Sequence, residues 1–465
     1  MQRGLDVLLA HEHTDPERLA VTGLSGGGWQ TILLSALDTR VKLAAPNAGY
    51  IGLDVRVGHT EDIGDIEQNP TDLATIADYP LLTAMLAPRP SLLLYNRTDD
   101  CCFQTHRAKP SVYDPVRPLF EALGKGDSFA FHDNQDPGTH NYDVDNRQQF
   151  YRFLNRHFLV DGTGMADEIP SQNEVRTAEE LTVGLPDKRE DFITLAADFA
   201  QHLPRVSWPH GDPAVVRDWQ KEAKKRLADV LRYRVPVWEA TESAPEIVTE
   251  ERRVKRSVLR LKDGWHIPLV TIEGNSPDAP VCVVTADTGM GSATPVIESL
   301  LAKDRTVIAA DLLFHGVCRS SVTQAHQWAM MLSANGDRTL GIQTVQLAAV
   351  IAHAGQSDKT VEVVGVGRLC SVVALTASAL SGTSVSQVTL RECLPTLKRL
   401  IEQATPYEDA APLFCFGLLE TFDIRELVGL LAPTPVDIFC DGNGTELLRL
   451  RELYARFGTL GFGVH

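Results

Sequence analysis

The chain has 465 residues and a mass of 51.0 kDa, about three times the size of a typical domain, so we expect more than one core. Its 43% hydrophobic and 23% charged residues are ordinary for a globular protein and exclude a disordered, collagen-like or coiled-coil chain. A formal net charge of −17 argues against nucleic acid as a partner, because phosphate backbones would be repelled. No apolar run is long enough to span a bilayer, so no membrane partner is expected.

The first candidate site lies near the start of the chain. Residues 18–25 form a short apolar, β-rich run, and residues 26–38 continue with a helix-length apolar pattern. The junction at 23–27, GLSGG, is a G-x-S-x-G motif between a strand and a helix, a turn that exposes a serine in a strained backbone conformation. We therefore predict that Ser25 is a nucleophile and that the Gly26 amide forms part of an oxyanion hole. A phosphate-binding glycine turn is the alternative, which the lack of a Walker lysine disfavours.

A nucleophilic serine needs a base and an acid, and with this turn the chain order is Ser, then Asp or Glu, then His. Residues 90–100 form an apolar run that ends in Asp99 and Asp100, which places both at the carboxyl edge of the predicted sheet. His140 lies in a loop between the last predicted strand and a closing helix at 141–158. We predict Asp99 as the acid, Asp100 as the alternative acid, and His140 as the base.

The segments LAVTGLSGGG, YNRTDD and GTHNYD resemble the α/β-hydrolase superfamily, and more narrowly its acetyl xylan esterase-like and dienelactone hydrolase-like esterases. The resemblance covers about residues 1–160, and the spacing from Asn96 to Asp99 fits the position of the family's acid. It implies a serine carboxylic-ester hydrolase with a Ser-His-Asp acyl-enzyme mechanism. The implied substrate is a small ester or an acylated carbohydrate that loses a small acyl group such as acetate.

Two other functions fit the same residues. A prolyl-oligopeptidase-like serine peptidase would use the same triad, although no propeller repeat is visible. An inactive pseudo-hydrolase or interaction protein needs no intact site. The acidic insertion at 51–80 is read either as a cap over the pocket or as a solvated loop. Trp29 comes just after the 23–27 turn, which we call the elbow. We interpret it as a core-packing residue rather than as a platform for sugar binding.

Cysteine usage predicts neither disulfides nor metal. Eight cysteines are too few and too scattered for a disulfide scaffold. Cys101 and Cys102 are adjacent but have no CxxC companion, so the sequence does not support a zinc site. We expect neither a metal nor a cofactor.

The rest of the chain predicts a second domain. Residues 161–244 are interpreted as a helical connector, with a strong helix pattern at 214–233. Residues 245–465 form a second α/β series, and its alternation with helices predicts a mostly parallel sheet. Its clearest expected strands are at 254–262, 266–274, 279–287, 306–314 and 360–367.

The second series repeats the first. The matching segments are 15–23 with 357–365 and 86–90 with 431–435. This alignment places Gly367 at the position of Ser25 and Gly444 at that of Asp99, so we expect 245–465 to be catalytically silent. The glycines at 365–367 lack the third glycine of a dinucleotide fingerprint, so no such cofactor is expected.

The repeat also predicts a difference between the copies. The second copy has residues 245–342 before the position equivalent to Met1, and the first copy has no counterpart. Those residues hold four expected strands, two of them beside the elbow strand, and a loop that normally donates the second oxyanion amide. We expect tandem α/β-hydrolase-like domains with mostly parallel sheets, the first of which, 1–160, lacks its N-terminal strands.

Three explanations are open. The chain is part of a longer esterase, which the intact triad favours; or another subunit, for instance in a homo-oligomer, covers the open sheet edge; or the chain is a decayed homologue. The first residues carry no export signal. If the N-terminus lies outside this chain, that observation assigns no compartment, and a secreted or periplasmic location stays open.

Overall fold

The structure is a computed structural model that describes residues 1–465 except 160–161, 249–251, 321–323, 358–359 and 443. It forms two compact units: Met1–Pro186 with Ser333–Gly336, and Asp187–Leu332 with Asp337–His465. The boundary falls within the segment 161–244. Among the described residues, no helix is long and apolar enough to cross a membrane.

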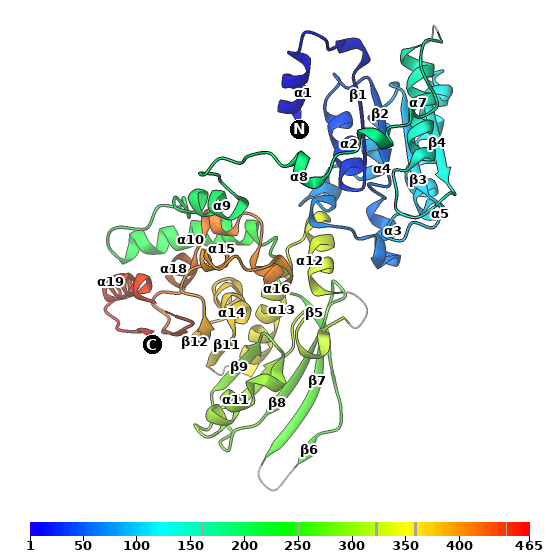
Figure 1. The fold of residues 1–465 in the computed structure, drawn as a ribbon. Helices are drawn as coiled ribbons and strands as arrows, with labels where there is room; N and C mark the ends of the chain where they lie inside the picture. Colours follow the sequence, from blue (N-terminus) through cyan, green and yellow to red (C-terminus); the bar gives the residue numbers. More distant parts are fainter. Residues whose placement is uncertain (160–161, 249–251, 321–323, 358–359, 443) are drawn as a thin grey trace. The chain divides into compact units, whose positions relative to one another are not determined.

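The first unit contains a four-stranded sheet in the order β1-β2-β3-β4, with all strands parallel (Figure 1). The strands are β1 (Ala20–Leu24), β2 (Leu43–Asn47), β3 (Ser91–Asn96) and β4 (Phe129–Asn134). Because they run in one direction, their carboxyl ends meet at one edge of the sheet, where α/β proteins carry their sites.

Two helices pack closely on this sheet. α2 (Gly26–Leu37) packs on β1 and β2, and α7 (Val144–Phe158) packs on β3 and β4. Phe153 of α7 is buried against apolar side chains from β2 and β3, among them Leu43 and Leu92. The other α-helices of this unit are α1 (Gln2–Leu9), α3 (Leu53–Gly58), α4 (Tyr79–Ala84), α5 (Thr105–Ala108), α6 (Arg117–Ala122) and α8 (Ala178–Leu181).

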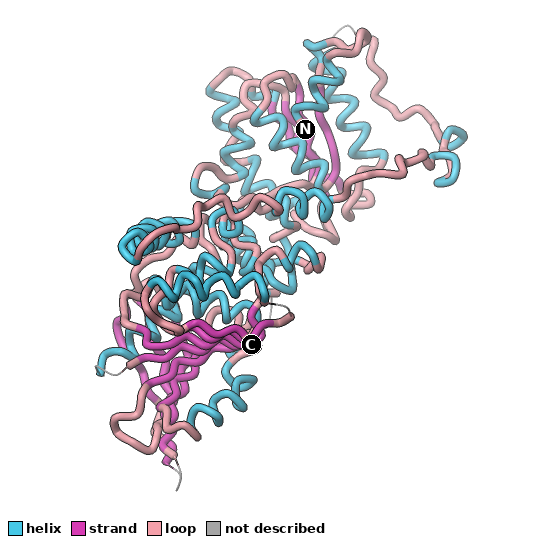
Figure 2. The backbone as a smooth tube through the Cα atoms, turned by 90° about the vertical axis from the view of Figure 1, so that its left-hand side faces the viewer, coloured by secondary structure: helices cyan, strands magenta, loops and turns pink. Residues whose placement is uncertain are grey.

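The second unit contains a ten-stranded sheet in the order β14-β13-β12-β11-β9-β10-β8-β7-β5, with β6 also paired to β7. The strands are drawn in magenta in Figure 2. Strands β9 to β14 are mutually parallel, and β5 to β8 are antiparallel to their neighbours. The strands are β5 (Trp238–Ser243), β6 (Ile247–Val248), β7 (Arg253–Leu261), β8 (His266–Ile272), β9 (Val281–Ala286), β10 (Thr306–Ala310), β11 (Val361–Val366), β12 (Val385–Cys393), β13 (Val436–Cys440) and β14 (Phe462–Val464).

Alternate residues of β9 pack into different clusters, as expected for a buried strand. Val283 joins a large core with α13 (Thr339–Ala354) and α14 (Arg368–Leu380), whereas Val284 packs with α11 (Thr294–Leu301). The other α-helices of this unit are α9 (Phe192–Ala200), α10 (Pro213–Val230), α15 (Arg399–Glu402), α16 (Tyr407–Ala410), α17 (Leu418–Thr421), α18 (Ile424–Gly429) and α19 (Leu450–Arg456). α12 (Ala325–Ala334) belongs to this unit up to Leu332, and its last two residues are assigned to the first unit.

The segment expected as a helical connector is divided in its structure. Leu227 of α10 is fully buried in the core of the second unit, so this helix is an integral part of that unit. β5 also lies within 161–244, and it is a strand that extends the second sheet beyond β7. This part of the segment was expected to be helical and is not.

The two sheets match over four strands. β11 to β14 are paired in the same order and direction as β1 to β4, and Ser25 and Gly367 occupy equivalent places between a strand and its following helix. In the second sheet, β9 pairs with the other side of β11. Among the described residues, β1 pairs only with β2. The predicted architecture, tandem α/β folds of which the first has fewer strands, is confirmed.

Candidate active site

The turn around Ser25 requires both strain and close packing. Ser25 has φ 57° and ψ −119°, a conformation that non-glycine residues rarely adopt. A Cβ on Gly23 would lie 2.7 Å from the carbonyl carbon of Gly27, and one on Gly28 would lie 2.4 Å from the carbonyl oxygen of Asn47. Glycines therefore let β1, α2 and the end of β2 approach one another while the serine is held in the turn.

The first amides of α2 border the serine. The Ser25 N–H donates to the Asn47 carbonyl (2.9 Å), which fixes the turn to the end of β2. Ser25 is the N-cap of α2, so Gly26 is in its first turn, where N–H groups lack helical acceptors and stabilise negative charge. A carboxylate borders this position, because Oε1 of Glu67 lies 3.6 Å from where a Cβ of Gly26 would be.

The structure brings Asp99 and His140 together. Nδ1 of His140 lies 2.9 Å from Oδ2 and 3.0 Å from Oδ1 of Asp99, and Asp99 is buried. With Nδ1 engaged, Nε2 is the nitrogen left to exchange a proton. His132 also pairs with a carboxylate, Asp145 (2.7 Å), but it lies within β4 rather than in the loop beyond it.

Asp99 is stabilised as an anion. Its Oδ1 accepts hydrogen bonds from the backbone N–H groups of Cys101 and Cys102, each at 3.0 Å, and its Oδ2 accepts one from Asn96 Nδ2 at 3.0 Å. Burial raises the pKa of Asp99, but the hydrogen bonds from His140, Cys102 and Asn96 outweigh it and lower the pKa below its usual value. The bond to Asp99 raises the pKa of His140 against the opposing effect of burial. The Asp99 carboxylate therefore stabilises the imidazolium that forms when His140 takes up a proton.

Asp100 has a different partner. Its Oδ1 accepts the backbone N–H of His140 at 2.8 Å. Asp99 thus contacts the imidazole, whereas Asp100 holds the loop that carries it.

Five buried asparagines connect the segments of the site: Asn47, Asn96, Asn134, Asn141 and Asn146. Nδ2 of Asn47 donates to the carbonyl of Asn141 (3.0 Å), next to His140. Nδ2 of Asn141 donates to Asn134 Oδ1, and Nδ2 of Asn146 donates to Asn96 Oδ1, each at 3.0 Å. The network joins the turn that anchors Ser25, the residue that holds Asp99, and the loop of His140.

Sequence reasoning missed this network, although a signal was present. Asn47, Asn96 and Asn134 are the last residues of three strands that are adjacent in the sheet. Asn96 and Asn134 each follow an apolar run that the sequence shows, and a buried amide must find hydrogen-bond partners. That pattern could have indicated a shared polar layer at the carboxyl edge.

The insertion at 51–80 is organised around one buried cation. Nη1 of Arg56 donates to the carbonyls of Ile63 (2.9 Å) and Gln68 (3.0 Å), and Nη2 donates to that of Ile51 (3.1 Å). The guanidinium also lies over the ring of Tyr79, 5.1 Å from its centroid. Burial lowers the pKa of Arg56, but the chain around it supplies hydrogen-bond acceptors. This segment is therefore folded rather than a solvated loop.

The same insertion contacts the helix that follows the elbow. Trp29 Nε1 donates to the Tyr79 hydroxyl (3.1 Å), which donates to the Gln68 carbonyl (2.7 Å). Trp29 thus anchors the insertion to α2, in line with a packing role.

In the second unit, the carboxylate of Asp287 occupies the turn equivalent to that of Ser25. Gly367 has φ 101°, and a Cβ there would lie 2.3 Å from Cγ of Asp287, the residue after β9. The carboxylate of Asp287 accepts hydrogen bonds from the N–H groups of Leu369 (3.1 Å) and Cys370 (2.7 Å), so the first amides of α14 are occupied. Gly444, aligned with Asp99, has no carboxylate.

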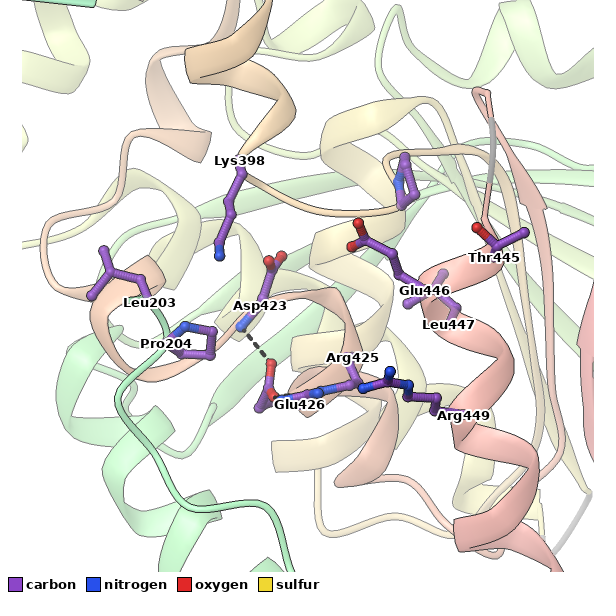
Figure 3. A pocket seen from close by; sticks show the side chains of 11 residues that line it. Leu203, Pro204, Lys398, Asp423, Arg425, Glu426, Thr445, Glu446, Leu447 and Arg449 are labelled. Atoms are coloured by element: carbon purple, nitrogen blue, oxygen red, sulfur yellow. Dashed lines mark hydrogen bonds and ion pairs between the residues drawn. The ribbon is translucent and has the colours of Figure 1, made fainter. Parts of the chain in front are cut away.

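The second unit contains several cavities, two of which are larger than the others. One of about 430 Å³ lies at this carboxyl edge and is lined by Asp287, His315, Gln343 and Arg368 among others, and burial with the nearby charge of Arg319 lowers the pKa of His315 to about 4. The other, of about 490 Å³, is shown in Figure 3, where Arg425 points across it beside Glu426. None of the predicted site residues lines either cavity.

No protein-family model and no curated protein matches the sequence. Among solved structures, a proposed acetyl xylan esterase from Bacteroides fragilis is 14% identical over 60% of this chain and 82% of its own, with a TM-score of 0.48. Acetyl xylan esterase 1 from a Thermoanaerobacterium species is 16% identical over 53% and 85%, with a TM-score of 0.35. A glucuronoyl esterase from Solibacter usitatus is 11% identical over 57% and 94%, with a TM-score of 0.39.

The class of fold follows from the chain itself. Parallel strands alternate with helices in both units, and in the first unit a strained serine between strand and helix is followed by aspartate and histidine at the same sheet edge. Both units have an α/β-hydrolase-like fold.

Proposed function

We propose that the chain is a serine carboxylic-ester hydrolase in which Ser25 is the nucleophile, His140 the base and Asp99 the acid. The observation that carries the proposal is the Asp99–His140 pair at the same sheet edge as a serine in a strained elbow. Two further observations support it: Ser25 has the strained backbone typical of a nucleophile turn, and hydrogen bonds lower the pKa of Asp99.

In this mechanism, Ser25 Oγ bonds to the carbonyl carbon of the ester while His140 Nε2 accepts the hydroxyl proton. The carbonyl oxygen becomes an anion, and the Gly26 amide at the start of α2 donates to it. His140 then gives its proton to the departing alcohol. A water molecule then attacks the acyl-enzyme in the same way, with His140 again accepting a proton. The carboxylic acid is released and the Ser25 hydroxyl is restored.

The proposed substrate is a carbohydrate with a small acyl group, such as acetate. The resemblance of the three sequence segments to acetyl xylan esterase-like enzymes suggests it. The Glu67 carboxylate next to Gly26 supports it, because a carboxylate there can accept hydrogen bonds from sugar hydroxyls beside the scissile ester.

A fluorophosphonate probe and two substrates test the proposal. We expect the probe to label the folded chain, and Ser25→Ala to abolish both labelling and hydrolysis of p-nitrophenyl acetate. A serine peptidase would also cleave peptide p-nitroanilides, which we expect to be inert. If the folded protein takes up no probe, the ester hydrolase proposal is wrong, and the alternative of an inactive pseudo-hydrolase or interaction protein gains support.

The second unit lacks the groups that serine catalysis needs at the turn equivalent to that of Ser25. Asp287 occupies the amides that an oxyanion would need, and Gly367 has no hydroxyl. We propose that this unit performs no serine catalysis. The outer edge of β1 could pair with a second copy, so a homo-oligomer stays a prediction.

A further inference from the structure

The turn that holds Asp99 also places two thiols near the proposed base. One ligand atom each from Cys101, Cys102 and His140, two sulfurs and an imidazole nitrogen, all lie within 4.8 Å of one another. The two Sγ atoms are 3.2 Å apart. Cys101 is exposed, whereas Cys102 is buried, so the cluster is reachable from solvent on one side.

The turn geometry holds these groups in place. The backbone N–H groups of both cysteines donate to Oδ1 of Asp99, and the N–H of His140 donates to Asp100. The backbones of all three donor residues are therefore fixed by the same pair of aspartates. Those two carboxylates also add negative charge, which favours a cation over an anion at this position.

We propose that Cys101, Cys102 and His140 form a binding site for a soft divalent cation such as Zn²⁺ or Cd²⁺. Two sulfur donors and one imidazole nitrogen are the donor set that such cations prefer over hard ions such as Mg²⁺ or Ca²⁺. Three protein donors leave a further position for water. On binding, each thiol releases its proton to solvent and the sulfur forms a bond to the metal.

Metal binding at these residues would inhibit ester hydrolysis, a consequence that rests on the proposed ester hydrolase function. A metal on Nε2 of His140 would occupy the nitrogen that accepts the Ser25 proton. A metal on Nδ1 would replace the hydrogen bond to Asp99. In either case the base loses a connection that its proposed role requires, so the cation is an inhibitor and not a cofactor.

Cd²⁺ titration under a phosphine reductant tests the site directly, because cadmium–thiolate bonds give an ultraviolet charge-transfer band. We expect one Cd²⁺ per chain with this band. Cys101→Ser/Cys102→Ser should abolish the band, and His140→Ala should weaken Cd²⁺ affinity at least about tenfold. Loss of a residue that only hydrogen-bonds to a metal ligand already costs about 10–100-fold in affinity. Cys318→Ser, a half-buried cysteine of the second unit, is the matched control and should bind as the unaltered chain does.

Hydrolysis of p-nitrophenyl acetate gives the second readout. The rate of each variant is compared with its own metal-free rate. The unaltered chain should lose at least about 90% of its activity at saturating Cd²⁺, because the metal occupies the base, and should recover its activity with EDTA. Cys101→Ser/Cys102→Ser should be inhibited far less at the same concentration. A band that survives in the double variant, or no band in the folded chain, would overturn the metal site. A normal band in a chain without hydrolytic activity would leave the metal site standing and reject only the proposed function.

Discussion

Two neighbouring aspartates contact the same histidine, and their different partners give them different roles. Asp99 binds the imidazole, and Asp100 binds the backbone N–H. We expect Asp99→Asn to lower kcat for p-nitrophenyl acetate by about 10⁴-fold, because the imidazole loses the partner that sets its tautomer and stabilises its cation. Steady-state kinetics with circular dichroism as a folding check measures this.

Asp100→Asn is the matched control for that change. The amide keeps an oxygen that can accept the His140 N–H, so we expect kcat to fall by less than about tenfold. If Asp100→Asn is the more damaging of the two, the assignment of the acid is wrong.

Glu67 offers a test of substrate class at the residue scale. Its carboxylate borders Gly26, where a substrate ester would lie. Glu67→Ala should raise KM for partially acetylated xylo-oligosaccharides by about tenfold, since a hydrogen bond to a charged group contributes about 1.5–3 kcal/mol. KM for p-nitrophenyl acetate, which has no sugar hydroxyl, should stay within about twofold. Equal changes for both substrates would contradict a hydroxyl-binding role.

Asn96 is a positioning residue whose effect should appear in both stability and rate. It donates to Asp99 Oδ2 and accepts from the amide of Asn146. Asn96→Ala leaves these buried groups without that partner, so we expect the free energy of unfolding to fall by about 1–3 kcal/mol. We also expect kcat to fall with KM nearly unchanged, because Asn96 acts through Asp99. Urea unfolding and steady-state kinetics separate the two effects.

At the scale of elements, local patterns predicted the strands with strong apolar runs. β1, β3 and helix α7 lie within the segments expected for them, because their side chains carry β-rich or amphipathic signals. β2, with the sequence LAAPN, gave no such signal, since two alanines and a proline have low strand propensity. It is a strand because β1 and β3 pair with it on either side.

The candidate site was predicted as far as chain order carries information. The motif and its order predicted Ser25 and His140 and left Asp99 and Asp100 as candidate acids. In the structure, Asp99 contacts the imidazole of His140. The asparagine network and the thiol–imidazole cluster depend on contacts between segments that are distant in sequence, such as Asn47 with Asn141. The order within the 51–80 insertion depends on Arg56, whose burial cannot be inferred from a polar, acidic segment.

Arg56 should control the insertion as one element. Arg56→Met keeps much of the apolar bulk but leaves the carbonyls of Ile51, Ile63 and Gln68 without that donor. Asn69 Nδ2 and the Tyr79 hydroxyl still donate to the Ile63 and Gln68 carbonyls, so the Ile51 carbonyl is the acceptor left unsatisfied. Such a loss costs about 1–3 kcal/mol, and we expect a decrease of that size in the free energy of unfolding, or local unfolding of 51–80. Limited proteolysis followed by mass spectrometry should show new cleavage there. Arg40→Met, a more exposed arginine in ion pairs, should not produce these cuts.

At the scale of the whole molecule, the two units share a strand arrangement but differ at the turn where the first carries its candidate nucleophile. The last four strands are arranged alike in both sheets, but the turn after β11 has Gly367 packed against a carboxylate. In the second unit Asp287, which directly follows a strand with no described counterpart in the first, accepts hydrogen bonds from the amides at the start of α14. A bound carboxylate stabilises that helix end and removes the donors that an oxyanion would need.

This arrangement predicts that a serine cannot simply be restored. In a Ser25→Ala background, Gly367→Ser should not give fluorophosphonate labelling, because the new Cβ would lie 2.3 Å from Cγ of Asp287. The substitution also places a non-glycine residue at φ 101°, so we expect the free energy of unfolding of this unit to fall by about 1–3 kcal/mol. Probe labelling and chemical unfolding measure the two effects.

Adding Asp287→Ala tests whether the Asp287 side chain alone prevents labelling, or whether the absence of a catalytic acid also does. The double change Gly367→Ser/Asp287→Ala frees the amides of Leu369 and Cys370, yet Gly444 supplies no carboxylate at the position aligned with Asp99. Without an acid to orient a base, we still expect no labelling, together with a further loss of about 0.5–2 kcal/mol from the uncapped helix. Labelling in either variant would show that the second unit retains a working base, and the assignment of this unit as silent would fail.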